Sequence, residues 1–226
     1  MLQRHGHKWS VEIFALAIHL LSYCYDTREM GLMFSRDLDP HGVLCLYAYA
    51  DASFRAPKGD ECALVMCQGA VVSEHFGTQT TTADSTMRAE YMAAYRASCE
   101  IMGCRNILEE LELQQQAPTV LYEDNQPCLR TATNNGAEQK RSKSFDLQWF
   151  MLKDRIIDNV IRMKYCVTAR MVADLGTKLL PRQQFEFLRD IMNGYAIVAA
   201  SRNHRKPLPT MAHWRYTEHQ IGRAHV

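Results

Sequence analysis

The chain has 226 residues, of which 47% are apolar and 23% charged, and its formal net charge is +1 at pH 7. A chain of this length and apolar content can bury a substantial core, which excludes disorder as its overall state. The near-zero charge gives no overall basic signal, so a nucleic-acid partner has to be argued from local residues.

The N-terminal segment 1–40 is predicted to contain an amphipathic helix over residues 10–28, capped by Ser10. Its apolar residues recur at helical spacing, at Val11, Phe14, Ala15, Ile18, Leu21 and Tyr25. The alternative is a secretory signal, because basic residues precede this apolar run. Glu12 and His19 interrupt the run, which is also shorter than the roughly 20 residues a membrane span needs. We therefore expect a packed helix, with neither secretion nor membrane insertion.

Three strands are expected next, over residues 43–52, 62–68 and 69–76. Each is a run of apolar and β-branched residues, and Gly69 separates the last two. The second and third strands are therefore predicted to be antiparallel. The first strand ends in Asp51.

A long helix is predicted from Asp84 to Met102, ended by Gly103, with a second helical stretch over residues 105–115. Glu90 lies on the first of these helices. Its helical face is otherwise made of small and apolar side chains, Ala83, Thr86, Met87, Ala93, Ala94 and Ala97. Such a face is typical of a helix that lies close against a sheet, so the carboxylate of Glu90 needs a partner there.

The remaining chain is predicted to alternate between strands and helices. A strand over residues 119–124 ends in Asp124, Asn125 and Pro127 open a helix, and a polar segment 134–144 follows. Residues 159–166 alternate apolar Ile161, Met163 and Tyr165 with charged residues, as in a half-buried strand. A final helix over 169–175 carries Asp174. This order predicts an α/β fold with a mixed sheet flanked by helices.

Four acids stand out by their positions: Asp51, Glu90, Asp124 and Asp174. Taken singly, each has an ordinary explanation as a helix cap, a first-turn acid or an ion-pair partner. If the strands that end in Asp51 and Asp124 are neighbours, however, all four carboxylates gather at one place and repel one another. Cations relieve such repulsion, and oxygen ligands suit Mg²⁺ or Mn²⁺. Two such ions can hydrolyse a phosphodiester.

The eight cysteines include no C-x-x-C pair, and several lie in apolar runs. This pattern favours a reducing compartment and argues against a zinc site. A secreted disulfide-linked protein is the weaker alternative.

Five motifs in order resemble the ribonuclease H domain that ends the Pol polyprotein of copia-type LTR retrotransposons. They are YADA at Tyr49–Ala52, STMRAEYMA at Ser85–Ala93, YEDNQ at Tyr122–Gln126, RSKSFDL at Arg141–Leu147 and ADLGTKLLP at Ala173–Pro181. The resemblance implies a ribonuclease H-like fold over residues 43–195, with a five-stranded mixed sheet flanked by helices. The family's catalytic and metal-binding acids correspond to Asp51, Glu90, Asp124 and Asp174.

The function implied by this resemblance is endonucleolytic hydrolysis of the RNA strand of RNA/DNA hybrids with two Mg²⁺ or Mn²⁺ ions, leaving 3′-hydroxyl and 5′-phosphate ends. Asp51 would bridge both ions, Asp174 would hold the ion that activates water, and Glu90 and Asp124 the ion at the leaving oxygen. Polar groups that can read the RNA 2′-hydroxyl are Ser85, Thr86 and Asn125. Basic residues that can contact phosphate are Lys140, Arg141 and Lys143, for which a solvated loop is the equal alternative.

Segment 1–40 resembles the region that joins reverse transcriptase to ribonuclease H in these polyproteins. The chain lacks the paired aspartates of a polymerase, so no DNA synthesis is expected, and the reverse transcriptase of the same polyprotein is the expected partner. The resemblance implies a location in the cytoplasm, within virus-like particles, or in the nucleus, and no secretion.

Three departures from the family pattern bear on activity. The turn at Ser73–Gln79 lacks the family's lysines, and Ser144 replaces a histidine, which predicts a weaker grip on phosphate. Gly176 replaces a bulky apolar residue, and glycine within a helix costs roughly 1 kcal/mol relative to alanine. Gly176 is therefore expected to loosen the placement of Asp174. No histidine is assigned a catalytic role.

Two other functions compete with this one. A transposase or integrase uses three acids on a similar sheet, but its glutamate comes last, whereas Glu90 here is second. A catalytically inactive retroelement remnant that only binds nucleic acid is the alternative from another class. Residues 196–226 are expected to form a disordered tail, and 221–226 (IGRAHV) resemble a sequencing adapter read in frame.

Overall fold

The computed structural model describes residues 10–35, 44–55, 58–134 and 143–195, except for the side chains of 143–146. The chain forms two units, Met1–Leu32 and Met33–Val226. In the first unit, helix α2 (Val11–Asp26) begins after Ser10, whose side chain accepts a hydrogen bond from the backbone of Ile13. The predicted helix and its cap are confirmed. None of the residues of α2 is buried, so the predicted packing is not confirmed.

In the described ranges, no helix combines the length and the apolar content that crossing a membrane requires.

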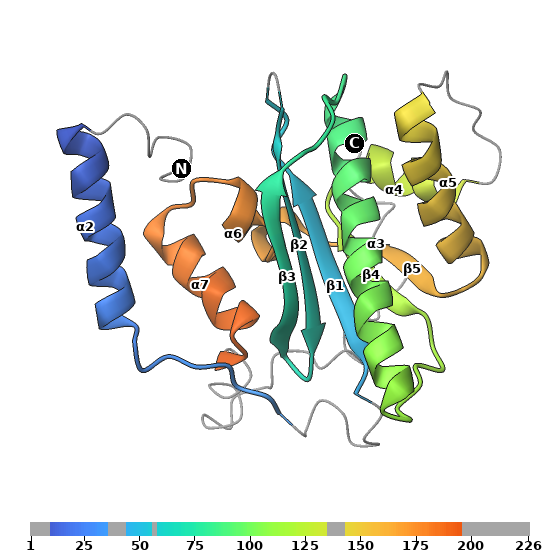
Figure 1. Cartoon of the computed structure of the whole chain (residues 1–226), viewed down its shortest axis with the longest axis horizontal. Helices are drawn as coiled ribbons and strands as arrows, with labels where there is room; N and C mark the ends of the chain where they lie inside the picture. Colours follow the sequence, from blue (N-terminus) through green and yellow to red (C-terminus); the bar gives the residue numbers. More distant parts are fainter. Residues whose placement is uncertain (1–9, 36–43, 56–57, 135–142, 196–226) are drawn as a thin grey trace, which may run out of the picture. The chain divides into compact units, whose positions relative to one another are not determined.

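The second unit is built on a five-stranded sheet in the order β3-β2-β1-β4-β5 (Figure 1). The strands are β1 (Leu46–Ala52), β2 (Asp60–Cys67), β3 (Ala70–Thr78), β4 (Thr119–Glu123) and β5 (Ile161–Tyr165). The first three strands are antiparallel, whereas β1, β4 and β5 run parallel. This is the mixed sheet of a ribonuclease H-like fold, as the sequence predicts.

A two-residue turn joins β2 to β3. Gln68 and Gly69 both have positive φ, 47° and 91°, which is the backbone of the turn that matches the twist of antiparallel strands. The predicted turn at Gly69 is therefore confirmed. Gln68 takes up the same left-handed conformation without being a glycine.

The alternating pattern of β5 is confirmed in part. Ile161 and Met163 are buried against the core, whereas Tyr165 is 41% exposed. β5 is an edge strand of the sheet.

One helix, α3 (Thr86–Glu110), replaces the two helices predicted around Gly103. Ser85 caps it and accepts a hydrogen bond from the backbone of Arg88 at 3.3 Å. Gly103 has no atom within 4 Å of where a Cβ would stand, so it lies on the open side of the helix and does not end it. The cost of an interior glycine, roughly 1 kcal/mol, is too small to stop a helix whose other face is buried.

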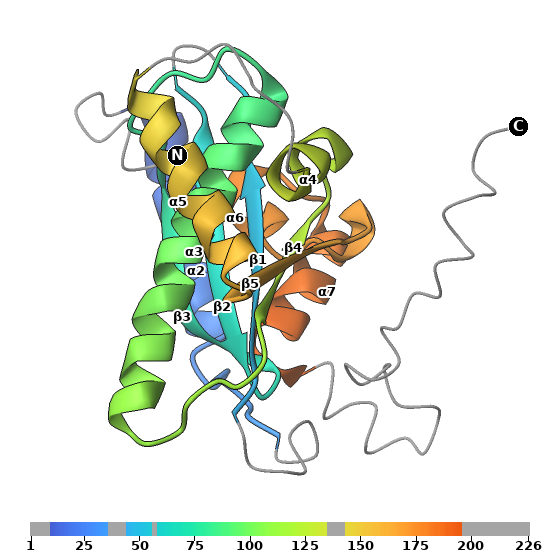
Figure 2. The ribbon, with the colours of Figure 1, turned by 90° about the vertical axis from the view of Figure 1, so that its right-hand side faces the viewer.

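The sheet separates two apolar layers. Helices α3, α4 (Gln126–Thr133) and α5 (Lys143–Ile157) contribute to one, and the segment 166–173 with residues near the end of α7 (Arg182–Met192) to the other. Figure 2 shows α3 and α5 on one side of the sheet and α7 on the other. Strand β1 serves both layers, because its alanines at 48, 50 and 52 face α3 while Tyr49 faces the other way.

The predicted helix over 169–175 is wrong in detail. Instead, a 3-10 helix, η2 (Thr168–Arg170), precedes the short helix α6 (Asp174–Thr177). Helix α7 is not among the elements that the sequence predicts. A signal for α7 exists, since Phe185, Leu188 and Ile191 recur at helical spacing and Leu188 is fully buried.

Gly176 allows α6 to lie directly on the sheet. A Cβ there would be 2.3 Å from the ring of Phe76 and 2.9 Å from the Cβ of Cys62. Asp174 at the start of α6 is buried, and its backbone N–H donates to the carbonyl of Met171 at 3.1 Å. Gly176 thus brings this helix close to the sheet, whereas the expectation that it loosens the placement of Asp174 stays a prediction.

All eight cysteines lie in described parts of the chain and are present as thiols, four of them buried. This gives no support to the disulfide-linked alternative.

The two glycines predict opposite responses to the same substitution. Gly103→Ala should raise the free energy of unfolding by roughly 0.5–1 kcal/mol, because alanine has a higher helix propensity than glycine and the added methyl group meets no neighbouring atom. Gly176→Ala should lower it by roughly 1–3 kcal/mol through overpacking against the sheet. Urea denaturation measures both. Equal stability of the two variants would contradict the packing role of Gly176.

Candidate metal centre

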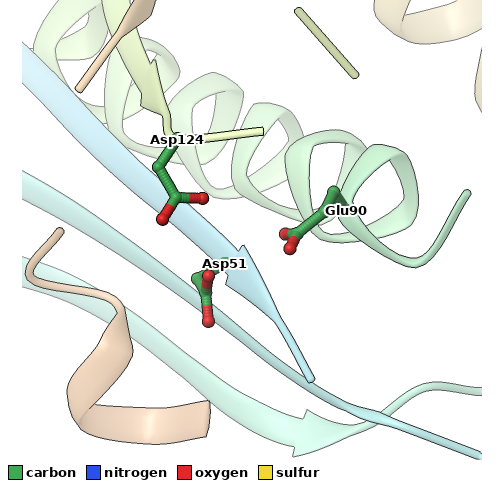
Figure 3. A group of neighbouring side chains, drawn as sticks. All are labelled: Asp51, Glu90 and Asp124. Carbon is green, nitrogen blue, oxygen red and sulfur yellow. The ribbon is translucent and has the colours of Figure 1, made fainter. Parts of the chain in front are cut away.

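Three carboxylates from separate parts of the second unit meet at one end of the sheet. Asp51 is the second-to-last residue of strand β1, Glu90 lies on α3, and Asp124 directly follows β4. One oxygen atom from each lies within 4.8 Å of the others. Figure 3 shows the three side chains approaching one another. The convergence expected from the sequence is present for these three acids.

Strand pairing brings the two aspartates together. In the parallel pair β1–β4, Tyr49 is level with Tyr122, and continuing this register brings Asp51 level with Asp124. Side chains alternate along β1, so Asp51 projects to the opposite side from Ala50 and Ala52. The hydroxyl of Thr168 donates to Asp124 at 2.9 Å. Asp51 is thus positioned by its place in β1, and Asp124 by the end of β4 and the hydroxyl of Thr168.

The small residues of α3 bring Glu90 to the same place. Ala89, Ala93 and Ala97 are fully buried against the sheet and allow a close approach of the helix. Glu90 is only 5% exposed, and its carboxylate accepts a hydrogen bond from the backbone N–H of Ala52 at 2.8 Å. This bond ties the helix to the end of the strand that carries Asp51.

Asp174 belongs to the site through Lys178 and not through the group of three. The Lys178 ammonium lies 2.6 Å from one oxygen of Asp174 and 3.1 Å from one oxygen of Asp51. The hydroxyl of Thr177 donates to the second oxygen of Asp51. The fourth acid is therefore beside Asp51, with a lysine between the two carboxylates.

Burial and mutual repulsion favour the protonated acids. Burial, followed by repulsion from Glu123 and Asp51, raises the pKa of the Glu90 carboxyl to about 10. Burial also raises the pKa of Asp174 to about 6, although the hydrogen bond from Lys178 opposes the shift. The pKa of Asp51 is raised by burial too, against its hydrogen bonds. Ionising the whole group is unfavourable unless positive charge enters.

Glu123 is a fifth acid at this end of the sheet that the sequence reading did not select. It is fully buried, and its carboxylate accepts hydrogen bonds from the backbone of Asn125 at 3.0 Å and from the thiol of Cys128. Burial raises its pKa well above the ordinary value. Its signal in the sequence is an acid as the last residue of an apolar strand. Repulsion from Glu123 increases the free energy that is needed to ionise Glu90.

Lys178 and Thr177 are not among the predicted site residues, although both lie within the motif ADLGTKLLP at Ala173–Pro181. The spacing of four residues between Asp174 and Lys178 is a sequence signal for their ion pair, because residues four apart lie on the same side of a helix.

The donor set fits a hard divalent cation. The three converging groups offer carboxylate oxygens alone, which are the ligands of Mg²⁺ and Mn²⁺. The raised pKa values of Asp51 and Glu90 are consistent with this, because a bound cation would stabilise the ionised forms of both acids. The cluster of Asp51, Glu90 and Asp124 is therefore compatible with the binding of a divalent cation.

The predicted nucleic-acid contacts are placed only in part. Ser85 and Asn125 are the caps of α3 and α4, with Asn125 accepting from the backbone of Cys128 at 2.9 Å, and Thr86 is exposed at the start of α3. Lys140 and Arg141 lie outside the described residues. Lys143 begins α5, but its side chain is likewise outside the description.

Comparison with known proteins agrees with the resemblance. No protein-family model matches the chain. The retrovirus-related Pol polyprotein from transposon TNT 1-94 of Nicotiana tabacum is 27% identical over 151 residues, covering 65% of this chain and 11% of that protein. The Ty1-DR5 Gag-Pol polyprotein of Saccharomyces cerevisiae is 23% identical over 182 residues, covering 79% and 10%. The chain thus spans about a tenth of the length of these curated relatives.

Solved structures of similar shape include two ribonucleases H. LC11-RNase H1, in complex with an RNA/DNA hybrid, is 12% identical with a TM-score of 0.44, covering 58% of this chain and 93% of that one. RNase H1 from the archaeon Halobacterium salinarum is 17% identical with a TM-score of 0.40 and the same coverage. The fold of this chain is established by its own strand order and directions.

A ribonuclease H-like sheet with an acidic centre at its strand ends defines the class of this domain. Within that class, its homologues are retrotransposon Pol polyproteins.

The raised pKa of Glu90 predicts that replacing this acid by its neutral amide stabilises the metal-free protein. In the metal-free protein the pKa of Glu90 is raised from 4.5 to about 10, so its contribution to stability is lost as the pH rises between these values. Glu90→Gln mimics the protonated acid and should raise the free energy of unfolding at about pH 8 in EDTA by roughly 1–3 kcal/mol. The difference from wild type should shrink near pH 5.

The matched control is Glu110→Gln, an exposed acid at the end of the same helix, which should leave stability within about 0.5 kcal/mol of wild type. A Glu90→Gln protein that is less stable than wild type at pH 8 would contradict the electrostatic account.

Proposed function

We propose that this chain is the ribonuclease H of a copia-type LTR retrotransposon Pol polyprotein, and that it cleaves the RNA strand of RNA/DNA hybrids endonucleolytically. The observation that carries the proposal is the meeting of Asp51, Glu90 and Asp124 within 4.8 Å at the strand ends. The choice of substrate comes from the resemblance to the ribonuclease H domain of copia-type Pol polyproteins, and homology to Pol polyproteins supports that resemblance. Cleavage would leave 3′-hydroxyl and 5′-phosphate ends.

The four acids divide the work by position. Asp51 lies between Asp124 and Glu90 on one side and Asp174 on the other, so it is the residue able to serve both halves of the centre. Two Mg²⁺ or Mn²⁺ ions, when bound, supply activation of the attacking water and stabilisation of the leaving 3′ oxygen. The backbone of Ala52 holds the Glu90 carboxylate in place.

Groups that recognise the substrate are proposed at the same end of the sheet. Ser85 and Thr86 begin the helix that carries Glu90, and Asn125 directly follows Asp124. The side-chain oxygens of Ser85 and Asn125 accept cap hydrogen bonds, so the exposed hydroxyl of Thr86 is the most accessible of the three for a 2′-hydroxyl. The basic residues Lys140, Arg141 and Lys143 remain proposed phosphate contacts.

We also propose that the chain works beside the reverse transcriptase of the same polyprotein, within virus-like particles in the cytoplasm or in the nucleus. Segment 1–40 is the part that would continue into that enzyme. The chain itself is proposed to have no polymerase activity.

The decisive experiment is cleavage of a hybrid in which the RNA and DNA strands carry different labels. With Mg²⁺ the RNA strand alone should be shortened, and EDTA should abolish cleavage. Asp51→Asn should lower the rate by about 100-fold or more, because it removes a charge from both halves of the centre.

Asp154→Asn is the matched control, since this acid is exposed on α5 and away from the strand ends, and its rate should equal that of wild type. Absence of cleavage by a folded protein with either Mg²⁺ or Mn²⁺ would reject the proposal and favour a remnant that only binds nucleic acid.

A further inference from the structure

Lys178 places a positive charge inside the acidic centre. Its ammonium contacts Asp174 at 2.6 Å and Asp51 at 3.1 Å, and both carboxylates belong to buried residues. We propose that Lys178 is a resident counter-cation, which neutralises the Asp51–Asp174 half of the centre in the metal-free protein and has to leave before a divalent ion binds there. This inference rests on the proposed function, because it concerns the binding of ions at the same centre.

The two halves of the centre differ in what occupies them. Asp51, Glu90 and Asp124 converge within 4.8 Å, and the hydrogen bonds recorded for Glu90 and Asp124 come from the uncharged backbone of Ala52 and hydroxyl of Thr168. On the other half, the Asp51 oxygen that faces Asp174 is already paired with an ammonium. A divalent ion entering the first half finds negative charge, whereas one entering the second meets a cation.

The local backbone keeps Lys178 at this position. The backbone N–H of Lys178 donates to the carbonyl of Asp174 at 3.0 Å, and Lys178 is the residue that caps the C-terminal end of helix α6. Lys178 follows Asp174 by four residues, so the two side chains can form an ion pair across one turn. Thr177, the preceding residue, donates its hydroxyl to the other oxygen of Asp51. The end of α6 therefore engages both oxygens of Asp51.

Electrostatics favour this arrangement and also allow its release. Burial opposes the charge on Lys178, but the hydrogen bond and attraction from Asp174, with those from Asp51, outweigh it and raise its pKa above the usual range. The side chain nevertheless remains 37% exposed, so the ammonium can move into solvent without crossing the core. A long flexible lysine suits a cation that leaves and returns.

The test is a calorimetric titration of the full chain with MnCl₂, without substrate. Wild type should bind one ion at the three-carboxylate half and a second at least about tenfold more weakly. Lys178→Met, which keeps the length and removes the charge, should tighten the second ion by about tenfold or more. Lys178→Arg, which keeps the charge, should titrate like wild type.

Thermal melting gives a second readout that needs no cleavage. In EDTA, Lys178→Met should melt roughly 2–4 °C below wild type, because Asp51 and Asp174 lose their counter-charge, and Mn²⁺ should remove this difference. Lys164→Met, an exposed lysine on β5, is the matched control and should change neither the melting temperature nor the titration.

The outcomes separate this inference from the proposed function. Two equally tight ions in wild type, or a Lys178→Met titration identical to that of wild type, would overturn the role of Lys178 while leaving RNA cleavage untouched. Should Lys178→Met fail to fold, Lys178→Gln, which is also uncharged but stays polar, supplies the same comparison with wild type and with Lys178→Arg. If folded wild type and Lys178→Met both bind no Mn²⁺, the inference and the metal dependence of the proposed function fall together.

Discussion

Repulsion between carboxylates gathered at one end of a sheet is the constraint on which the rest of the second unit depends. Parallel pairing of β1 with β4 brings Asp51 level with Asp124, and the alanine face of α3 brings Glu90 close to them. Burial then makes their charges costly, as the pKa of about 10 for Glu90 shows. A fold optimised for stability alone would not place acids there. Binding of cations at this site would offset the free-energy cost of ionising these buried carboxylates.

The segment from η2 to Lys178, the residue that follows α6, completes the centre. It supplies the hydroxyl that bonds Asp124, the fourth acid Asp174, and the two residues that engage Asp51. Gly176 lies between these residues and lets the short helix reach the sheet, where a side chain would clash with Phe76. A departure from the family pattern thus acts on packing, and it keeps the fourth acid near the other three.

Much of this organisation could be predicted from the sequence, because apolar runs, caps and strand-end acids are local signals. The five strands, the Ser10 cap, the helix that opens at Asn125 and the meeting of three acids all follow from such signals. The errors arose where tertiary contacts decide. Packing against the sheet carries α3 through Gly103, and only the structure shows that Lys178 lies between two acids. Glu123 is not predicted, because in the motif YEDNQ the family's catalytic acid corresponds to the next residue, Asp124.

The measurement that tests the central claim most directly is X-ray diffraction at the manganese absorption edge from crystals of the protein soaked in Mn²⁺. The account predicts an anomalous peak within coordination distance of Asp51, Glu90 and Asp124, with carboxylate oxygens as its protein ligands. Absence of any peak among these three residues, in crystals where the side chains are ordered and Mn²⁺ is in large excess over the protein, would contradict the claim that this acidic group is a metal centre.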